Sequence, residues 1–264
     1  MKKQLKIVVL AKQVPDTRNV GKDAMTPEGT VNRAALPAIF NPEDLNALEA
    51  ALSIKDQAEG STVHILTMGP PRAADIIRDA MFRGADGGYL LTDRKFAGSD
   101  TLATSYALSC ALRKIRPDLI VAGRQAIDGD TAQVGPQVAE KLNLPQVTYA
   151  EQIIELKDNA IVIKRRLEHG TEVVECPLPM VMTVNSSAPD CRPRNARRVM
   201  KYKFALTPSE IAAQPDSAYA GYAAGKPYLQ IVEWSAADVE PDEQQLGLNA
   251  VSYTHLRAHE TPEH

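Results

Sequence analysis

The segment Gly123-Arg-Gln-Ala-Ile-Asp-Gly-Asp-Thr-Ala-Gln-Val-Gly-Pro136 is the most informative part of this chain. It follows an apolar run, Leu119-Ile-Val-Ala122, which indicates a buried parallel strand. At its end, Val134, Val138 and Leu142 have the i, i+4, i+8 spacing of one helix face. A glycine-bearing loop between a buried strand and a helix N-terminus is a common nucleotide site in α/β proteins, because free N–H groups and the helix dipole favour phosphate.

Two acids in this loop leave a second interpretation open. Asp128 and Asp130 argue against a plain phosphate cradle, and Asp130 can instead cap the following helix while Thr131 offers its hydroxyl to a ligand. Because Pro136 has no N–H, the carbonyl of Ala132 is expected to lose its helical partner, which would splay the first turn and make room for a larger ligand. The simpler alternative is an ordinary strand-to-helix turn with a good N-cap.

Composition excludes several classes of protein. The chain has 264 residues, 44% of them hydrophobic, and a formal net charge of -3, which gives no electrostatic reason to expect nucleic acid or an anionic membrane as partner. No apolar run approaches the roughly 20 residues of a membrane span. The run Ile7–Ala11 is too short for a signal peptide and ends at Lys12, so we expect the first strand of a cytoplasmic protein. The widely spaced Cys110, Cys176 and Cys191 argue against a disulfide framework or a metal site.

The first 142 residues alternate between strand and helix patterns. This alternation predicts a Rossmann-like α/β fold, a parallel sheet with helices on both faces and ligand sites at the carboxyl ends of its strands. The expected strands are Leu5–Ala11, Thr62–Thr67, Gly88–Leu91 and Leu119–Ala122.

After Pro145 the pattern changes to short strands separated by turns, which indicates added antiparallel hairpins. The expected strands are Val147–Ala150, Ile153–Leu156, Ala160–Arg166 and Glu172–Glu175, with Leu178–Val184 as a last core strand. From Asn185 the chain becomes polar and basic, and residues 185–235 have too few apolar side chains for a core of their own. We therefore expect an extended C-terminal arm that lies on this domain or on a partner, with Ala218–Pro227 as a loop.

Four loops meet at one rim if the sheet is built in this way. They are Ala11–Asp16, Asn41-Pro-Glu-Asp44, Thr67-Met-Gly-Pro70 and Gly123–Val134, and together they can surround an adenosine and its phosphates. Each is weak alone, because Asn41–Asp44 is also an ordinary helix start and Lys12 is more often a solvated lysine. Motifs for a nucleophilic serine, a Walker loop, a GxGxxG fingerprint and a zinc protease are absent, so we assign no catalytic residue and no metal ligand.

These loops resemble those of the beta subunit of electron-transfer flavoproteins. The similarity also includes Thr17, Ala47, Glu49 and the run Arg83-Gly-Ala-Asp86. It extends over residues 4 to 249. It implies that the four loops hold an adenine nucleotide. The candidate binding residues are Leu10, Ala11, Lys12, Asn41, Pro42, Glu43, Asp44, Met68, Gly69, Gly123, Arg124, Gln125, Ala126, Ile127, Asp128, Gly129, Asp130, Thr131, Ala132, Gln133 and Val134.

The run Asp128–Pro136 is similar to that of electron-bifurcating members of the family. The resemblance implies a second FAD in the beta subunit, which takes electrons from NADH and passes them to ferredoxin or flavodoxin and to an acyl-CoA dehydrogenase-type flavoenzyme. The chain would then be an electron carrier that works only with an alpha subunit, in a heterodimer. Two alternatives are a housekeeping beta subunit with structural AMP and a universal-stress-type regulator that binds an adenine nucleotide.

The basic run Ser187–Lys201 matches the family's partner-recognition loop. The resemblance implies that an exposed apolar side chain anchors the acceptor there, and that position falls at Ala196, smaller than the usual leucine. The candidate partner contacts are Arg192, Arg194, Ala196, Arg197 and Arg198.

Three regions follow from the pattern and the resemblance together. Residues 1–185 are expected to form the nucleotide-binding domain, and residues 186–249 the arm that contacts the alpha subunit and the redox partner. After Leu246-Gly-Leu-Asn249 the family's usual Gly-Ser-Pro-Thr run is missing. We therefore interpret residues 250–264 as a non-native tail.

Overall fold

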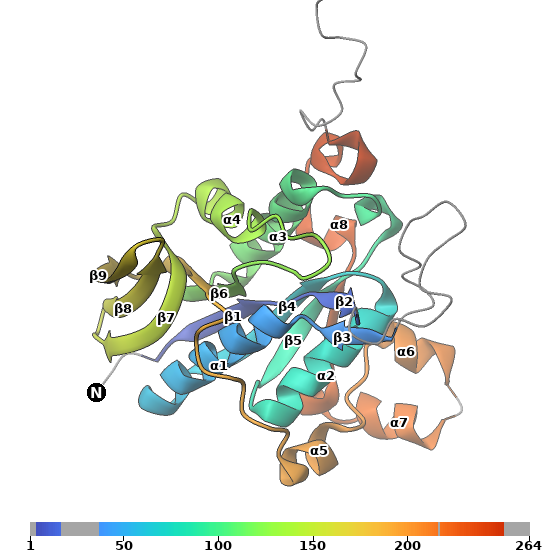
Figure 1. Cartoon of the computed structure of the whole chain (residues 1–264). Helices are drawn as coiled ribbons and strands as arrows, with labels where there is room; N and C mark the ends of the chain where they lie inside the picture. The colour runs from blue at the N-terminus through green and yellow to red at the C-terminus, as the bar shows by residue number, and fades with distance from the viewer. Residues whose placement is uncertain (1–3, 17–36, 216, 251–264) are drawn as a thin grey trace, which may run out of the picture.

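The computed structural model describes residues 4–16, 37–215 and 217–250 (Figure 1). Its strands are β1 (Lys6–Leu10), β2 (Gln13–Pro15), β3 (Ala38–Phe40), β4 (Thr62–Met68), β5 (Gly87–Leu91), β6 (Leu119–Gly123), β7 (Gln146–Leu156), β8 (Ala160–Leu167), β9 (Gly170–Pro177), β10 (Met180–Val184) and β11 (Val232–Trp234). Its α-helices are α1 (Pro42–Gln57), α2 (Ala74–Arg83), α3 (Thr101–Ile115), α4 (Val134–Leu142), α5 (Ala196–Tyr202), α6 (Pro208–Ala213), α7 (Ala218–Ala224) and α8 (Ala236–Val239). The 3₁₀ turns are η1 (Pro71–Ala73), η2 (Arg94–Phe96), η3 (Pro227–Leu229), η4 (Glu243–Gln245) and η5 (Gly247–Asn249).

The main sheet has the order β11-β5-β4-β1-β6-β10-β7-β8-β9. Every neighbouring pair from β11 to β7 is parallel, whereas β7, β8 and β9 pair antiparallel. This confirms the predicted α/β class with an antiparallel addition. The small antiparallel pair β2–β3 is an element that the sequence pattern did not predict.

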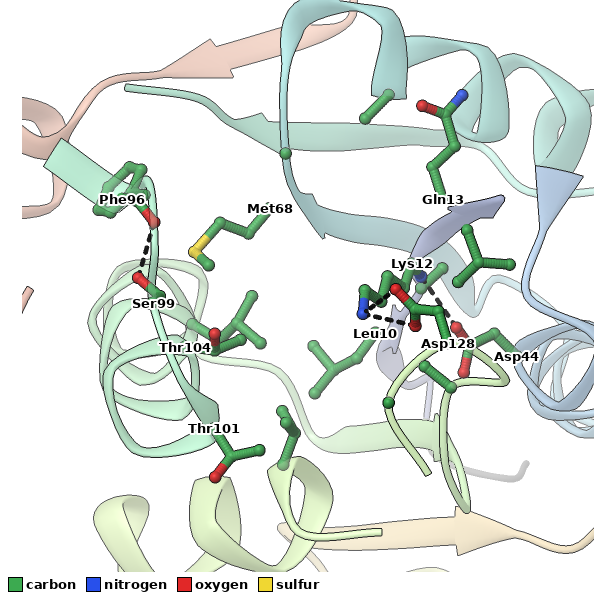
Figure 2. A pocket seen from close by; sticks show the side chains of 18 of the residues that line it. Leu10, Lys12, Gln13, Asp44, Met68, Phe96, Ser99, Thr101, Thr104 and Asp128 are labelled. Atoms are coloured by element: carbon green, nitrogen blue, oxygen red, sulfur yellow. Dashed lines mark hydrogen bonds and ion pairs between the residues drawn. The ribbon is translucent and has the colours of Figure 1, made fainter. Parts of the chain in front are cut away.

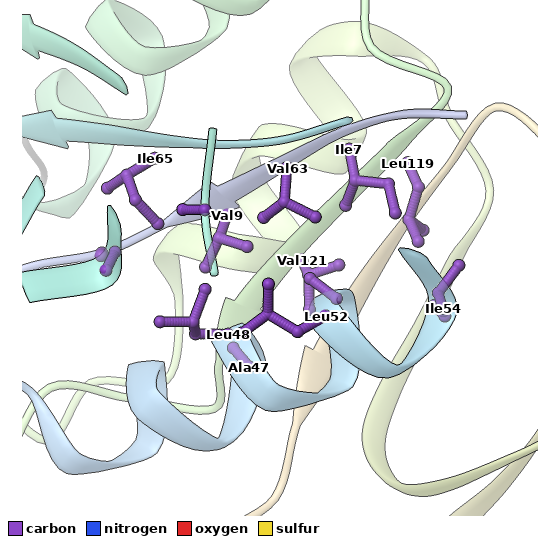
Figure 3. Close-up of a cluster of buried hydrophobic side chains, with 14 of the residues drawn as sticks. Ile7, Val9, Ala47, Leu48, Leu52, Ile54, Val63, Ile65, Leu119 and Val121 are labelled. Carbon is purple, nitrogen blue, oxygen red and sulfur yellow. The ribbon is translucent and has the colours of Figure 1, made fainter. Parts of the chain in front are cut away.

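Alternate side chains of each parallel strand point to opposite faces of the sheet and pack into two separate hydrophobic cores. Ile7 and Val9 pack with the buried side chains of α1 and α2, while Val8 and Leu10 pack with those of α3, α4 and α8. Figure 3 shows the first core, where Leu48 of α1 lies against strands β1, β4 and β6. The near-continuous apolar runs of these strands are therefore explained by burial on both faces of the sheet.

Two sequence predictions after residue 145 are wrong in detail. The two strands expected before and after residue 151 form one strand, β7, whose register with β8 shifts at irregularities between Ala150 and Gln152 and between Ile153 and Glu155. These irregularities break the strict alternation that would have shown a single strand. The loop expected over residues 218–227 contains helix α7, capped by the hydroxyl of Ser217, and its alanine-rich sequence is a good helix former.

Part of the predicted arm folds onto its own chain. β11 adds to the edge strand β5, and α5 packs on α2. Among the described residues, no helix is both long and apolar enough to cross a membrane. The segment interpreted as a non-native tail lies outside the described residues from position 251 onward.

We expect Gly88→Ala to lower the free energy of unfolding by about 1–3 kcal/mol, because an added methyl group overpacks the first core. Its Cβ would lie 2.6 Å from Cγ2 of Ile77 and 2.9 Å from the backbone oxygen of Ile65. Chemical denaturation measures the change. The matched control is Gly87→Ala, whose Cβ would meet only the ring of His64 at 3.5 Å, and an equal loss in both variants would contradict the prediction.

Candidate functional site

The carboxyl ends of β1, β4, β5 and β6 surround a cavity of about 900 Å³ (Figure 2). Most of the predicted binding residues line it. These are Leu10, Ala11, Lys12, Asp44, Met68, Gly69, Gly123, Arg124, Gln125, Ala126, Asp128, Gly129, Asp130, Thr131, Ala132, Gln133 and Val134. The convergence of loops from separate parts of the chain follows from the parallel sheet, which brings the carboxyl ends of its strands to one edge.

Asn41, Pro42, Glu43 and Ile127 are predicted binding residues that do not line the cavity. Asn41 does not cap its own helix; its amide donates to the carbonyl of Gln125 at 2.9 Å and accepts from the N–H of Ile127 at 3.1 Å. The Glu43 carboxylate accepts from the N–H of Gln125 at 3.0 Å and from the Arg124 guanidinium at 2.9 Å. The side chains of Asn41 and Glu43 therefore fix the β6–α4 loop by hydrogen bonds, although they do not line the cavity themselves.

Asp44 connects three elements at the base of the cavity. Its carboxylate accepts from the backbone N–H of Lys12 at 2.8 Å and from that of Gly123 at 3.1 Å. Burial raises the pKa of Asp44 to about 7, although the hydrogen bonds from Lys12, Asn41 and Gly123 oppose that rise. The first turn of α1 is thereby fixed to the ends of β1 and β6.

Lys12 and Asp128 form an ion pair across the cavity wall. The Lys12 ammonium lies 2.7 and 2.9 Å from the two carboxylate oxygens of Asp128, as Figure 2 shows. The second acid of the loop, Asp130, accepts from the side-chain amide of Gln125 at 2.8 Å. The carboxylates of Asp128 and Asp130, which on sequence alone argue against a phosphate site, are therefore each bound by a side chain of the protein.

The β6–α4 loop differs from the predicted helix cap. Helix α4 begins at Val134, and its N-cap position is Gln133, which makes no side-chain capping bond. Asp130 and Ala132 both have left-handed backbone, with φ of 48° and 53°, and lie outside the helix, so the prediction that Asp130 caps it is wrong. The prediction that Pro136 deprives the carbonyl of Ala132 of a helical partner is also wrong, because Ala132 lies outside the helix and an N–H at the third helical position has no acceptor within the helix.

This geometry leaves donors at the cavity. The N–H groups of Val134 and Gly135 have no acceptor within α4, because they belong to its first turn, and both residues line the cavity. A Cβ added to Gly129 would meet nothing within 4 Å, so the loop leaves open space there. A helix N-terminus with free N–H groups and the positive end of its dipole is suited to an anionic group.

The β5–α3 loop is a part of the site that sequence reasoning missed. Residues lining the cavity from this region are Thr92, Asp93, Arg94, Phe96, Ala97, Gly98, Ser99, Asp100, Thr101 and Thr104. Thr101 at the start of α3 donates to the side-chain oxygen of Gln133 at 2.8 Å and so links the two loops. The sequence could have indicated this loop, because the predicted strand that ends at Leu91 has its carboxyl end on the same edge of the sheet as β1, β4 and β6.

The predicted partner contacts divide into two groups. Arg192 binds Glu49 at 2.8 Å and Asp56 at 2.9 Å, and Arg194 binds Asp79 at 2.6 Å, so both tie the segment to α1 and α2. The hydrogen bonds that Arg192 donates to the carboxylates of Glu49 and Asp56 raise its pKa. Ala196 and Arg197 are exposed at the start of α5, and Arg198 is half-buried. The first group therefore anchors the segment, whereas the second lies at the surface of α5.

We expect Gly123→Ala to disrupt the site, because its Cβ would lie 2.7 Å from the backbone carbon of Glu43 and 2.8 Å from the backbone nitrogen of Asp44. Backbone atoms cannot rotate away, so α1 must shift, and the free energy of unfolding should fall by about 1–3 kcal/mol. Gly129→Ala is the matched control in the same loop. Chemical denaturation distinguishes them, and equal stability of the two variants would contradict this account.

Asp44 predicts a pH dependence of stability. Its folded pKa, about 7, lies above its usual value of 3.8, so the folded state holds this proton more tightly than the unfolded state. The contribution is present in full below pH 4 and is lost as pH rises toward 7, with a slope of at most about 1.4 kcal/mol per pH unit.

Unfolding free energies from pH 5 to 8 check this dependence. Asp44→Asn should remove the slope, although it also weakens the contacts of the carboxylate, and Asp130→Asn should keep it. Parallel pH curves for the wild type and Asp44→Asn would refute the assignment.

Comparison with known proteins agrees with this architecture. The model of the electron transfer flavoprotein domain matches residues 28–207. The chain is 51% identical over 180 residues to the caffeyl-CoA reductase-Etf complex subunit CarD of Acetobacterium woodii, covering 68% of each chain. It is 50% identical over 182 residues to the acryloyl-CoA reductase electron transfer subunit gamma of Anaerotignum propionicum (68% of this chain, 67% of the relative). It is also 41% identical over 244 residues to the electron transfer flavoprotein subunit beta of Clostridium acetobutylicum (92% and 83%). These matches, over most of the chain, show that the protein belongs to the electron transfer flavoprotein family and is related to its beta subunits.

Proposed function

We propose that this chain is the beta subunit of a heterodimeric electron-transfer flavoprotein and that its cavity holds FAD. The observation that carries the proposal is the cavity itself. Its volume of about 900 Å³ lies at the upper end of the range of small-molecule sites, about 300–1,000 Å³, and leaves room beyond a mononucleotide. The chain would supply position and electrostatics, and the redox chemistry would belong to the flavin.

The residues present fit the pyrophosphate and adenosine parts of such a ligand. The N–H groups of Val134 and Gly135, which have no acceptor within α4, and the open space at Gly129 suit the pyrophosphate. The engaged carboxylates of Asp128 and Asp130 leave these donors available. When bound, FAD would supply two-electron exchange with NADH and one-electron exchange with ferredoxin or flavodoxin and with the flavin of the alpha subunit.

The names of two relatives support the branch that we propose. One is a subunit of a caffeyl-CoA reductase-Etf complex and the other an electron transfer subunit of an acryloyl-CoA reductase. By analogy, the final acceptor would be an acyl-CoA dehydrogenase-type flavoenzyme. Arg192 and Arg194 would position the recognition segment through their bonds to α1 and α2. Ala196, Arg197 and Arg198 would face the acceptor. The arm over residues 186–249 would contact both the alpha subunit and the redox partner.

The test is the nucleotide content of the heterodimer. The chain is co-expressed with its alpha subunit, the purified complex is denatured, and the released FAD and AMP are quantified. Two FAD and no AMP per heterodimer are expected. One FAD with one AMP would instead establish a housekeeping beta subunit, and ATP without flavin would establish a nucleotide-binding regulator.

A matched pair of variants assigns the second flavin to this cavity. Met68 lines the cavity, and Met68→Trp adds bulk there, so this variant should release about one FAD fewer per heterodimer. Met200→Trp makes the same change on exposed α5, where the side chain is 65% exposed, and should release as much FAD as the wild type. Full flavin content in Met68→Trp would place the second flavin elsewhere.

A further inference from the structure

Tyrosines and lysines gather on one surface formed by α5, α7 and η3, which neither the fold nor the cavity explains. We define the tyrosine–lysine surface as Tyr219, Tyr222, Tyr228, Lys201, Lys203 and Lys226. We propose that it is a docking surface for an acidic face of the redox partner protein. The inference rests on the proposed function and extends it from the recognition segment to the adjoining part of the arm.

Ring contacts hold the surface together. The ring of Phe204 stacks on that of Tyr219, with centroids 4.5 Å apart and planes 15° apart, and meets the ring of Tyr222 edge-on at 5.9 Å. The ring of Tyr228 meets that of Tyr202 edge-on at 6.4 Å. Rings fixed in this way lose little conformational entropy when a partner covers them, which favours tyrosine at interfaces.

These rings remain open to solvent although they pack on one another. Tyr219 is 59% exposed, Tyr222 46% and Tyr228 44%. Three large, partly apolar side chains side by side on a surface are typical of an interaction site, because interface cores are enriched in tyrosine.

The lysines lie over the same rings. The ammonium of Lys226 is 3.6 Å from the ring centroid of Tyr222, and that of Lys203 is 4.8 Å from the ring of Phe204. Lys201 lies 4.7 Å from the ring of Tyr202 and 5.2 Å from that of Tyr228. The cations therefore sit among the aromatic side chains, as the charged rim of an apolar patch does.

The positive charge of the tyrosine–lysine surface favours an acidic partner. Between Ala196 and Leu229 the sequence contains five cations and two acids, whereas the whole chain has a net charge of -3. One of the acids, Glu210, binds Arg78 at 2.9 Å and is not available to neutralise the lysines. A local positive surface on an acidic protein is complementary to an acidic partner and speeds its association.

The position of the surface indicates which partner it meets. Lys201 contacts rings on both α5 and η3, so the tyrosine–lysine surface continues the segment of Ala196 and Arg197 that we propose for the acceptor. Figure 1 shows α6 and α7 side by side at the lower right, with α5 at the bottom of the molecule below α2. We therefore assign the surface to the same redox partner as that segment.

Kinetics of the flavin-loaded heterodimer test the proposal. The probe is the acyl-CoA dehydrogenase-type flavoenzyme of the host that the wild-type heterodimer reduces fastest. In Tyr222→Ser/Tyr228→Ser and in Lys203→Gln/Lys226→Gln, KM for this enzyme should rise about 5- to 20-fold with kcat, flavin content and alpha-subunit binding unchanged. Raising the salt concentration should raise KM of the wild type more than that of the lysine variant.

Lys157→Gln is the control, because Lys157 forms an exposed ion pair with Glu175 of β9, far along the chain from this surface. The KM of this variant should equal that of the wild type. An unchanged KM in both double variants overturns the proposed docking surface. Loss of alpha-subunit binding in place of a rise in KM overturns it as well. A flavin-loaded heterodimer that reduces no enzyme of this class also overturns it. Absence of flavin from the heterodimer instead refutes the proposed function, so the two failures are distinguishable.

Discussion

The buried carboxylate of Asp44 joins the end of β1 and the end of β6 to the first turn of α1 through two backbone N–H groups. The close approach of these backbones requires a residue without a Cβ at position 123, because a methyl group there would meet the backbone of Glu43 and Asp44. The β6–α4 loop leaves from this junction, held from behind by Asn41 and Glu43. The shape of the cavity therefore depends on one helix start, that of α1, at its base.

The electrostatics of the site depend on how the protein distributes its own charges. Burial favours the neutral form of Asp44, Lys12 neutralises Asp128, and Gln125 binds Asp130. The carboxylates around the rim are therefore compatible with an anionic ligand at the N-terminus of α4. The same loop that looked too acidic for phosphate becomes suitable once each acid has a partner in the fold.

The C-terminal arm follows a different principle. Its first part is tied to α1 and α2 by ion pairs of Arg192 and Arg194, and a later part adds strand β11 to the sheet edge. Between these anchors, α5 to α7 carry exposed tyrosines and lysines. The cavity thus lies at the carboxyl edge of the sheet, while the exposed basic surface lies on elements that have no part in forming the cavity.

Local sequence determined the class of fold and most of the loops of the site. Apolar runs flanked by turn residues identified the central strands, because strands buried on both faces need no polar alternation. The resemblance of the loops identified the family. The pattern failed where structure is set by long-range contacts, as in the irregular register of β7, the edge strand β11, and helix α7, whose aromatic rings pack on Phe204 of another segment.

Only the tertiary structure decided the roles of individual side chains. An Asn-Pro-Glu-Asp helix start is common, and nothing local says that its side chains bind a loop more than 80 residues away. The β5–α3 loop likewise became part of the site only because parallel pairing brings the end of β5 to the same edge as β1, β4 and β6. Sequence determined the central strands and the helices between them, since these depend on local periodicity. Which side chains meet was decided by the sheet order, since contacts between distant segments exist only once the strands have paired.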